Sequence, residues 1–181
     1  CIEAEDGIRG FALSRGLGEL YKRQGILRKK PWDAAFCEEP SSKSETDQIH
    51  RKATIVIEHL IQASDVSHTM QHWTVYQKWN ERLFHEMYAS FKAGRMETDP
   101  SKNWYKGEIG FFDHYIIPLA KKLKECGVFG VSSDEFLNYA ESNRAAWEEM
   151  GQELVEKFIA TYKEKVFGGF RKRWSSDQLL D

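Results

Sequence analysis

The stretch that decides the fold is QASDVSH, residues 62–68, where an apolar helical segment ends on an acidic residue. The segment before it, residues 53–63, is rich in Ile, Val, Leu and Ala. An ionised carboxylate beside such a segment is costly unless it is paired or bound to a cation. Two explanations stay open for Asp65. Either Asp65 or Ser67 caps the next helix by accepting backbone N–H bonds, or Asp65 binds a metal ion.

Two histidines favour the metal explanation. Asp65, His68 and His72 are spaced i, i+3 and i+7, which places them on one face of a continuous helix. Carboxylate and imidazole groups are ordinary ligands of divalent cations. One reading of the chain is therefore a helical metal binder that needs no other domain.

The periodicity of apolar residues predicts an all-α fold, a helical bundle without a convincing strand. Helices are expected over residues 47–64, 69–93, 106–125 and 132–150, with a continuation over 152–166. In the second of these helices, one recurring set of residues is expected to face the core. Its members are Trp73, Tyr76, Trp79 (or Asn80), Leu83, Phe84, Met87 and Phe91.

Several residues mark where these helices bend or end. Pro118 should kink the third helix, because proline lacks the N–H of the helical ladder. Gly127 is well placed to terminate that helix as a C-cap. Ser132 and Glu135 have the spacing of a capping box that opens the fourth helix. Gly151 is expected to interrupt the fourth helix, and Gly168-Gly169 to end its continuation.

The chain divides into three parts on composition. Residues 1–45 are expected to be irregular, with a Pro, Ser, Glu and Lys-rich loop near their end. Residues 46–167 form the helical domain, and residues 168–181 form a basic, aromatic tail. The chain opens at Cys1 without a Met, which suggests a piece of a longer protein.

Composition excludes several classes of protein. The net charge is −2 with 30% charged residues, so bulk electrostatics do not indicate a nucleic-acid partner. No apolar run approaches the roughly 20 residues of a membrane span. Three widely spaced cysteines form neither a disulfide framework nor a zinc pattern. We expect a cytoplasmic protein, or the cytosolic part of a membrane-bound multidomain parent.

Two linked motifs carry a family resemblance. The motifs ASDVSH at residues 63–68 and GEIGFFD at 107–113, with Trp79 between them and Pro118-Leu119 after them, resemble class I 3′,5′-cyclic-nucleotide phosphodiesterases. The likeness covers residues 51–126 and falls on the C-terminal half of the catalytic domain. It is closest to algal, diatom-like members. It implies the helical HD-type fold of that family.

The resemblance also implies roles for individual residues. Asp65 falls on a metal-ligating aspartate, and Glu108 falls on the glutamine that reads the purine. Phe111 falls on the aromatic residue that clamps the base, and Tyr76 on an aromatic residue lining the same pocket. Trp79 falls on a core tryptophan. The implied substrate is a cyclic nucleotide, cAMP or cGMP, and the implied cofactors are divalent metals, Zn with Mg or Mn, in the intact domain.

The chain departs from the family pattern in its histidines. The His-Asn-x-x-His and His-Asp motifs that supply the acid and most metal ligands are absent, and none of the six histidines lies in such a motif. We therefore expect no catalytic residue in this fragment, and no activity without the missing N-terminal half of the domain. The segment before Thr46 does not match the expected family helices. Exposed apolar faces would favour a homo-oligomer.

The second departure is Glu108 in place of glutamine. A glutamine amide both donates and accepts, whereas an ionised glutamate only accepts. Guanine offers two adjacent donors, N1–H and N2–H, whereas adenine offers one donor beside one acceptor. The substitution predicts either a preference for cyclic GMP or a Glu108 that is held protonated.

A different class of function remains open. The chain would then be a non-catalytic helical module whose apolar faces dock a partner or dimerise. The incomplete set of metal ligands favours this alternative.

Overall fold

The structure is a computed structural model, and it describes residues 32, 35–36, 45–132 and 134–177, with side chains to residue 166. The described residues are helical throughout their regular structure and contain no strand. This confirms the all-α prediction. The α-helices are α4 (Glu45–Asp65), α5 (Trp73–Lys92), α6 (Trp104–Phe111), α7 (Ile117–Glu125) and α8 (Glu135–Asp177). Shorter helical turns connect them: η1 (Ser67–Met70), η2 (Pro100–Lys102), η3 (Phe112–Ile116) and η4 (Gly130–Ser132).

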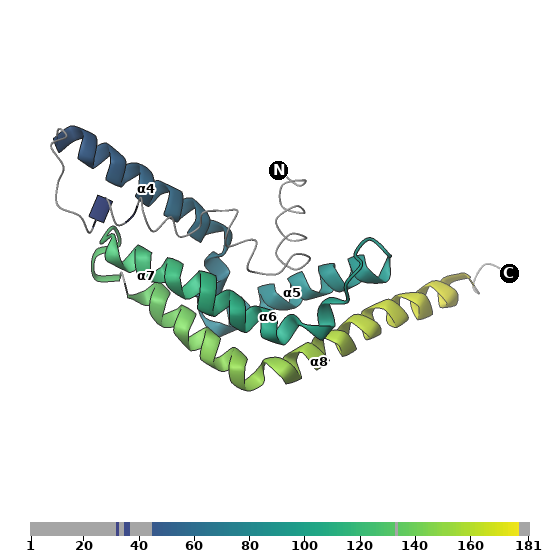
Figure 1. The fold of residues 1–181 in the computed structure, drawn as a ribbon. Coiled ribbons are helices and arrows are strands. Elements are labelled where there is room, and N and C mark those ends of the chain that lie inside the picture. The colour runs from purple at the N-terminus through teal and green to yellow at the C-terminus, as the bar shows by residue number, and fades with distance from the viewer. Residues whose placement is uncertain (1–31, 33–34, 37–44, 133, 178–181) are drawn as a thin grey trace.

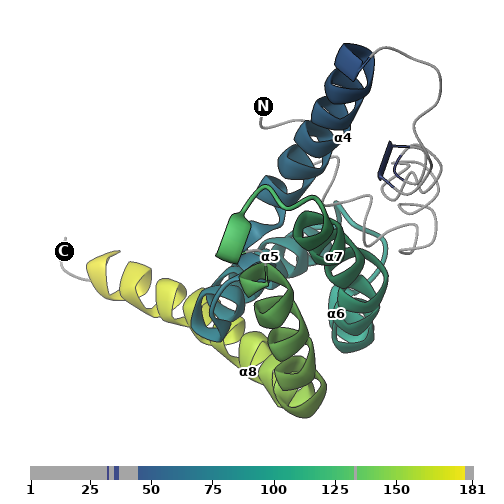
Figure 2. The same cartoon turned by 90° about the vertical axis from the view of Figure 1, so that its left-hand side faces the viewer.

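The helix α8 organises the bundle. It packs against α5, α6, α7, η1 and η3, and its C-terminal part extends beyond them (Figure 1). The helix α4 contacts α7 and projects away from the other helices (Figure 2). The centre of the core is built from large side chains that are almost completely buried, namely Trp104, Trp147, Tyr76, Phe84, Phe112, Met70, Ile116, Leu119 and Leu123. Among the described helices, none combines the length and the apolar composition that crossing a membrane would require.

Pro118 changes the helix in a specific way. The predicted helix 106–125 is present as α6, a π-helical segment (η3) and α7, and Pro118 lies in the first turn of α7. The Ile117 N–H donates to the Phe112 carbonyl, five residues back instead of four. Proline has no N–H for the carbonyl of His114, and its ring crowds that carbonyl. The wider π turn just before the proline relieves this conflict while the chain stays helical.

The predicted end of the third helix is confirmed, and the predicted start of the fourth helix is wrong. The helix α7 ends at Glu125, and Gly127 follows it with a positive φ of 68°, as expected of a glycine C-cap. The capping box is wrong, because Ser132 ends the turn η4 and α8 begins only at Glu135. The Asn138 N–H bonds to the Asp134 carbonyl at 2.9 Å, so the helical ladder starts from Asp134.

The helix α8 continues through both positions where glycine was expected to stop it. It runs without interruption past Gly151 and past Gly168-Gly169 to Asp177, although its direction changes about midway (Figure 1). A Cβ atom on Gly151 would lie 2.7 Å from Cε2 of Trp147. Gly151 therefore makes room for an indole ring that is fully buried one turn earlier.

A second, smaller core lies between α4 and α7. Trp32 and Ala35, from the segment expected to be irregular, are helical and pack with Ile55 of α4. The Trp32 ring lies 4.9 Å from the His59 ring, and the Lys122 ammonium lies 4.4 Å from the Trp32 ring centre. Part of residues 1–45 thus packs against the helical domain.

Replacing Gly151 by alanine should destabilise the protein. The clash with the Trp147 ring should cost about 1–3 kcal/mol, because a buried ring cannot move aside easily. That cost exceeds the gain in helix propensity of about 1 kcal/mol. Gly107→Ala in α6 is the matched control, since a Cβ atom there meets no atom within 4 Å. Denaturant unfolding should show a loss of stability for Gly151→Ala and a gain for Gly107→Ala. Equal gains would contradict the packing argument.

Candidate functional site

Asp65 is the last residue of α4 and is exposed. Its carboxylate makes no hydrogen bond or ion pair with any residue in the described part of the chain. It does not cap the next helix, because η1 starts without a side-chain cap, and Ser67 does not cap it either. The capping explanation is therefore wrong. Burial, together with the negative charge of nearby Asp65, raises the pKa of Tyr115 to about 12.

The proposed histidine face does not form. His68 lies in η1, and His72 is the N-cap of α5, so the two belong to different elements from Asp65. The His72 Nδ1 atom accepts from the Thr74 backbone N–H at 3.3 Å, which makes His72 a capping residue. The helical spacing that suggested a metal binder is thus interrupted between residues 65 and 73. Among the described residues, no group of three or more His, Cys, Asp or Glu side chains is placed to hold a metal ion.

Tyr76 and Glu108 meet across the bundle. The Tyr76 hydroxyl, on α5, donates to Oε2 of Glu108, on α6, at 2.8 Å. Tyr76 is fully buried and Glu108 is half-buried. Burial of Tyr76, and after it the charge of Glu108, raise the pKa of the phenol well above its usual value. The hydroxyl therefore keeps its proton and acts as a donor to the carboxylate.

Two buried residues that were not predicted as site residues orient this hydrogen bond. The Trp104 indole N–H donates to Oδ1 of Asn80 at 3.1 Å, and Nδ2 of Asn80 donates to the Tyr76 hydroxyl oxygen at 3.4 Å. An indole has no acceptor, so it fixes which end of the Asn80 amide faces it. Asn80 must then donate to Tyr76, and Tyr76 must donate to Glu108. The chain of bonds assigns Oε2 of Glu108 as an acceptor.

The position of Asn80 corrects an expectation about its neighbour. Trp79 is 48% exposed, whereas Asn80 is 3% exposed. The Arg82 guanidinium packs on the exposed Trp79 ring, 4.9 Å from its centre. Trp79 is thus not a core residue. The only sequence signal for Asn80 was its alignment with the apolar face of α5.

Phe111 is the last of the four predicted site residues. It is half-buried at the end of α6, and its ring stacks on the ring of Tyr115 with 5.2 Å between centres and 16° between planes. The neighbouring Phe112 is fully buried, and its ring contacts Tyr76 edge-on at 5.2 Å. Glu108 lies one turn before Phe111 on the same helix. Tyr76, Glu108 and Phe111 therefore lie on α5 and α6, which the Tyr76–Glu108 hydrogen bond joins, whereas Asp65 lies at the end of α4.

The environment of Glu108 changes its acidity. Burial raises the pKa of its carboxyl group to about 7, and the hydrogen bonds from Tyr76 and Asn80 oppose part of this increase. Near neutral pH the group exchanges between the ionised and the protonated form. The same side chain can then act as an acceptor only, or as a donor and an acceptor.

Comparison with known proteins gives one match. A family model described as 3′5′-cyclic nucleotide phosphodiesterase matches residues 21–129, more than half of the chain. The chain belongs to this phosphodiesterase family. No curated protein and no solved structure matches.

Membership in the phosphodiesterase family corrects the extent of the resemblance. The match begins at residue 21, well before Arg51, so the segment that precedes Thr46 does align with the family. The match includes Asp65, Tyr76, Glu108 and Phe111, and it stops before α8 begins. The candidate site therefore lies within the phosphodiesterase-like part of the chain.

Phosphodiesterases of this family use divalent metal ions. The exposed carboxylate of Asp65, which has no hydrogen-bond or ion-pair partner among the described residues, suits one ligand position of such a site. The described residues do not supply the remaining ligands of a two-metal centre. They fit a contribution to a metal site and not a complete one.

The pKa of Glu108 should be visible in stability measurements. A carboxyl group whose pKa is raised from 4.5 to about 7 in the folded state favours folding fully below pH 4.5, and this contribution is lost as pH rises through 7. The stability of the wild type relative to Glu108→Gln should therefore fall, on the order of 3 kcal/mol, between pH 4 and pH 8. Urea unfolding of both proteins across this range measures it. A difference that does not depend on pH would show that Glu108 titrates normally.

Proposed function

We propose that the chain is part of a metal-dependent 3′,5′-cyclic-nucleotide phosphodiesterase domain that binds the purine base and supplies one metal ligand. The observation that carries this proposal is the hydrogen bond from Tyr76 to Glu108, within the family-matched segment and one helical turn from Phe111. Tyr76 and Glu108 provide a polar edge, and Phe111 provides an aromatic face. A purine requires both, since it stacks on aromatic rings and is distinguished at its edge.

Asp65 has a separate role in the proposal. Hydrolysis of a cyclic phosphodiester requires a nucleophile at neutral pH and neutralised phosphate oxygens, which bound divalent metals supply. Asp65 would hold one of these ions, because its carboxylate has no partner among the described residues. Tyr115 supports this arrangement, because its ring stacks on Phe111 and the negative charge of Asp65 acts on its hydroxyl group.

The protonation of Glu108 would set the choice of purine. An ionised Glu108 accepts both N1–H and N2–H of guanine. A protonated Glu108 donates from Oε1 to N1 of adenine, while Oε2, already an acceptor for Tyr76, accepts N6–H. Cyclic GMP would therefore be preferred above the pKa of Glu108, and cyclic AMP below it.

The remaining metal ligands and the catalytic acid would come from the part of the parent protein that precedes this chain. An apolar ridge on α4 supports such an arrangement. It consists of Ile49, Ala53, Ile57 and Ile61, each four residues apart and all exposed. The ridge leads directly to Asp65, one turn beyond Ile61. A segment packed on this ridge would reach the metal ligand.

The alternative is a non-catalytic helical module that docks or dimerises through the same ridge. The observation that favours it is the exposure of Ile57 and Ile61, at 55% and 60%, together with that of Trp79. Under this alternative a second copy of the chain covers the ridge. The double variant Ile57→Lys with Ile61→Lys would then convert a dimer to a monomer in analytical ultracentrifugation. Under this alternative neither the wild type nor the double variant would hydrolyse a cyclic nucleotide.

Hydrolysis assays test the proposed function. With Zn²⁺ and Mg²⁺ or Mn²⁺ added, the 181-residue chain alone should not hydrolyse cyclic AMP or cyclic GMP. Joined to the preceding part of its parent, it should do so. Asp65→Ala should then lower kcat by about 100-fold or more, because a ligand of the metal is lost. Lys163→Ala, on the exposed surface of α8, is the control. Activity of the joined protein that is insensitive to Asp65→Ala would refute the assigned role.

Purine choice provides an independent test. The ratio of kcat/KM for cyclic GMP to that for cyclic AMP should increase about tenfold per pH unit near pH 7 and level off outside the titration. Glu108→Gln should remove the pH dependence of this ratio, because glutamine does not titrate. A ratio that is constant with pH in the wild type would show that Glu108 does not select the base.

A further inference from the structure

The helix α8 lies outside the family-matched segment, yet it packs against several segments that carry or adjoin the candidate site residues. It packs on η1, which follows Asp65, and on α5, which carries Tyr76. It also packs on α6, which carries Glu108 and Phe111, and on η3, which follows α6. Two consecutive residues of α8, Asn143 and Arg144, make hydrogen bonds to the stretch that contains η1 and to η3. Neither residue has a place in the proposed function so far.

Asn143 holds the segment that connects Asp65 to α5. Its side chain is 1% exposed, and its Nδ2 donates to the Thr69 carbonyl at 2.9 Å and to the Gln71 carbonyl at 2.7 Å. An amide nitrogen carries two hydrogens, and both are used here. These two carbonyls lie in the non-α-helical stretch between α4 and α5. Asn143 thus fixes the path of that stretch, where the backbone lacks a regular ladder of its own.

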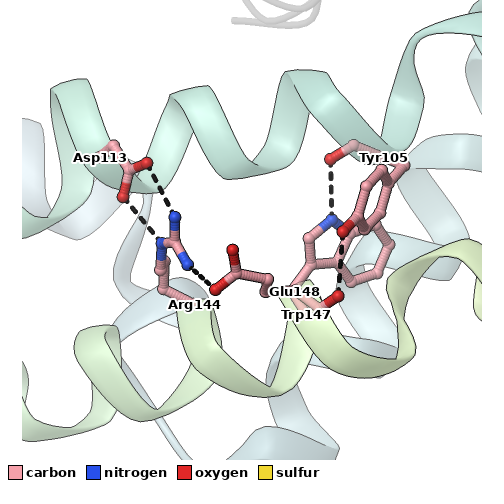
Figure 3. A network of polar contacts seen from close by, with 5 residues as sticks. All are labelled: Tyr105, Asp113, Arg144, Trp147 and Glu148. Atoms are coloured by element: carbon pink, nitrogen blue, oxygen red, sulfur yellow. Dashed lines mark hydrogen bonds and ion pairs between the residues drawn. The ribbon is translucent and has the colours of Figure 1, made fainter.

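Arg144 holds the segment that follows Phe111. Its Nε atom donates to Oδ1 of Asp113 at 2.8 Å, and its Nη2 donates to Oδ2 at 3.1 Å (Figure 3). Its Nη1 is bonded to Glu148, one turn further along α8. The two parallel bonds lower the pKa of Asp113 below its usual value, and they keep that carboxylate ionised. A planar fork of this kind fixes orientation as well as distance.

A second contact ties the beginning of α6 to α8. The Trp147 indole N–H donates to the Tyr105 carbonyl at 3.1 Å, and the Tyr105 hydroxyl donates to the Glu148 carbonyl at 2.9 Å (Figure 3). Glu148 is therefore common to this contact and to the Arg144 fork. The segment from Tyr105 to Asp113, which contains Glu108 and Phe111, is held against α8 at both ends.

Asn143 and Arg144 reach two different segments because consecutive residues of a helix point about 100° apart. One side chain faces η1 and the other faces η3. We propose that Asn143 and Arg144 are positioning residues that set the separation between the Asp65–Tyr76 segment and the Glu108–Phe111 segment. The proposal rests on the proposed function, since it assigns these segments to the metal ligand and the base-binding group.

Arg144 acts through orientation more than through stability. Its side chain is 24% exposed and that of Asp113 is 38% exposed. Ion pairs exposed to this degree contribute little to the free energy of folding. The π-helical turn η3, in which Asp113 lies, has a weaker hydrogen-bond pattern than an α-helix and therefore gains more from an external tether.

The test compares Arg144→Lys with Lys124→Met. Lysine keeps the positive charge at position 144 but cannot form the fork. Lys124 pairs with Asp134 at 2.6 Å through exposed side chains and has no contact with the described site residues. Lys124→Met therefore removes an ion pair away from the candidate site and serves as the matched control. In the phosphodiesterase domain joined to its preceding part, Arg144→Lys should raise KM for both cyclic nucleotides about tenfold, with kcat within about twofold. Lys124→Met should change neither.

A second measurement does not depend on activity. Amide hydrogen exchange in the 181-residue chain should become about tenfold faster at residues 112–117 in Arg144→Lys, while residues 84–88 of α5 stay unchanged. Asn143→Asp, which replaces the two donors by acceptors, should accelerate exchange at residues 69–76. A uniform acceleration over all helices would indicate a general loss of stability and would overturn the proposal.

The two measurements separate the possible failures. If the joined domain hydrolyses no cyclic nucleotide, the proposed function is wrong, and the exchange pattern still decides whether the two residues hold their segments. If hydrolysis occurs but Arg144→Lys has the same KM as Lys124→Met, the positioning role is overturned and the proposed function stands.

Discussion

The site depends on the direction of one chain of hydrogen bonds, from Trp104 through Asn80 and Tyr76 to Glu108. The chain starts at an indole, which only donates, and it ends at a carboxyl group, which accepts. Each intermediate group is buried, so reversing any bond would leave a polar atom unsatisfied at considerable cost. The orientation of the Tyr76 hydroxyl is thus a consequence of core packing around Trp104.

Local sequence patterns predicted the helices well, since periodicity and glycine or proline signals act over one or two turns. Periodicity left open whether Trp79 or Asn80 faces the core, and it could not decide for Asn80. Hydrophobicity favours a buried tryptophan, but the bond that satisfies Asn80 comes from a residue 24 positions away. The helix through Gly151 was missed for a similar reason, because its cause is the position of the Trp147 ring.

Local sequence patterns were also insufficient to predict the candidate site. The resemblance predicted that Tyr76 and Glu108 contribute to one pocket, and the structure places the Tyr76 hydroxyl 2.8 Å from Oε2 of Glu108. The prediction that Asp65, His68 and His72 share one helical face was wrong. It required a continuous helix, whereas the chain changes from α4 to η1 and then to α5. A spacing argument holds only if the backbone between its residues is regular. Asn143 and Arg144 had no local signal at all, since their partners lie on distant segments.

The hydrogen bond from Tyr76 also determines how a glutamate at position 108 differs from a glutamine. A glutamine amide at this position could present either its oxygen or its nitrogen to a base, and only the Tyr76 hydroxyl would select between them. In a carboxyl group, Oε2 must accept from Tyr76. Only the protonation of Oε1 can then change what the side chain presents to a base. Burial places the pKa of that proton at about 7. The packing that fixes Oε2 as an acceptor therefore leaves Oε1 to gain or lose a proton with pH. A base bound there would be selected by the protonation of Oε1, and not by the rotation of an amide.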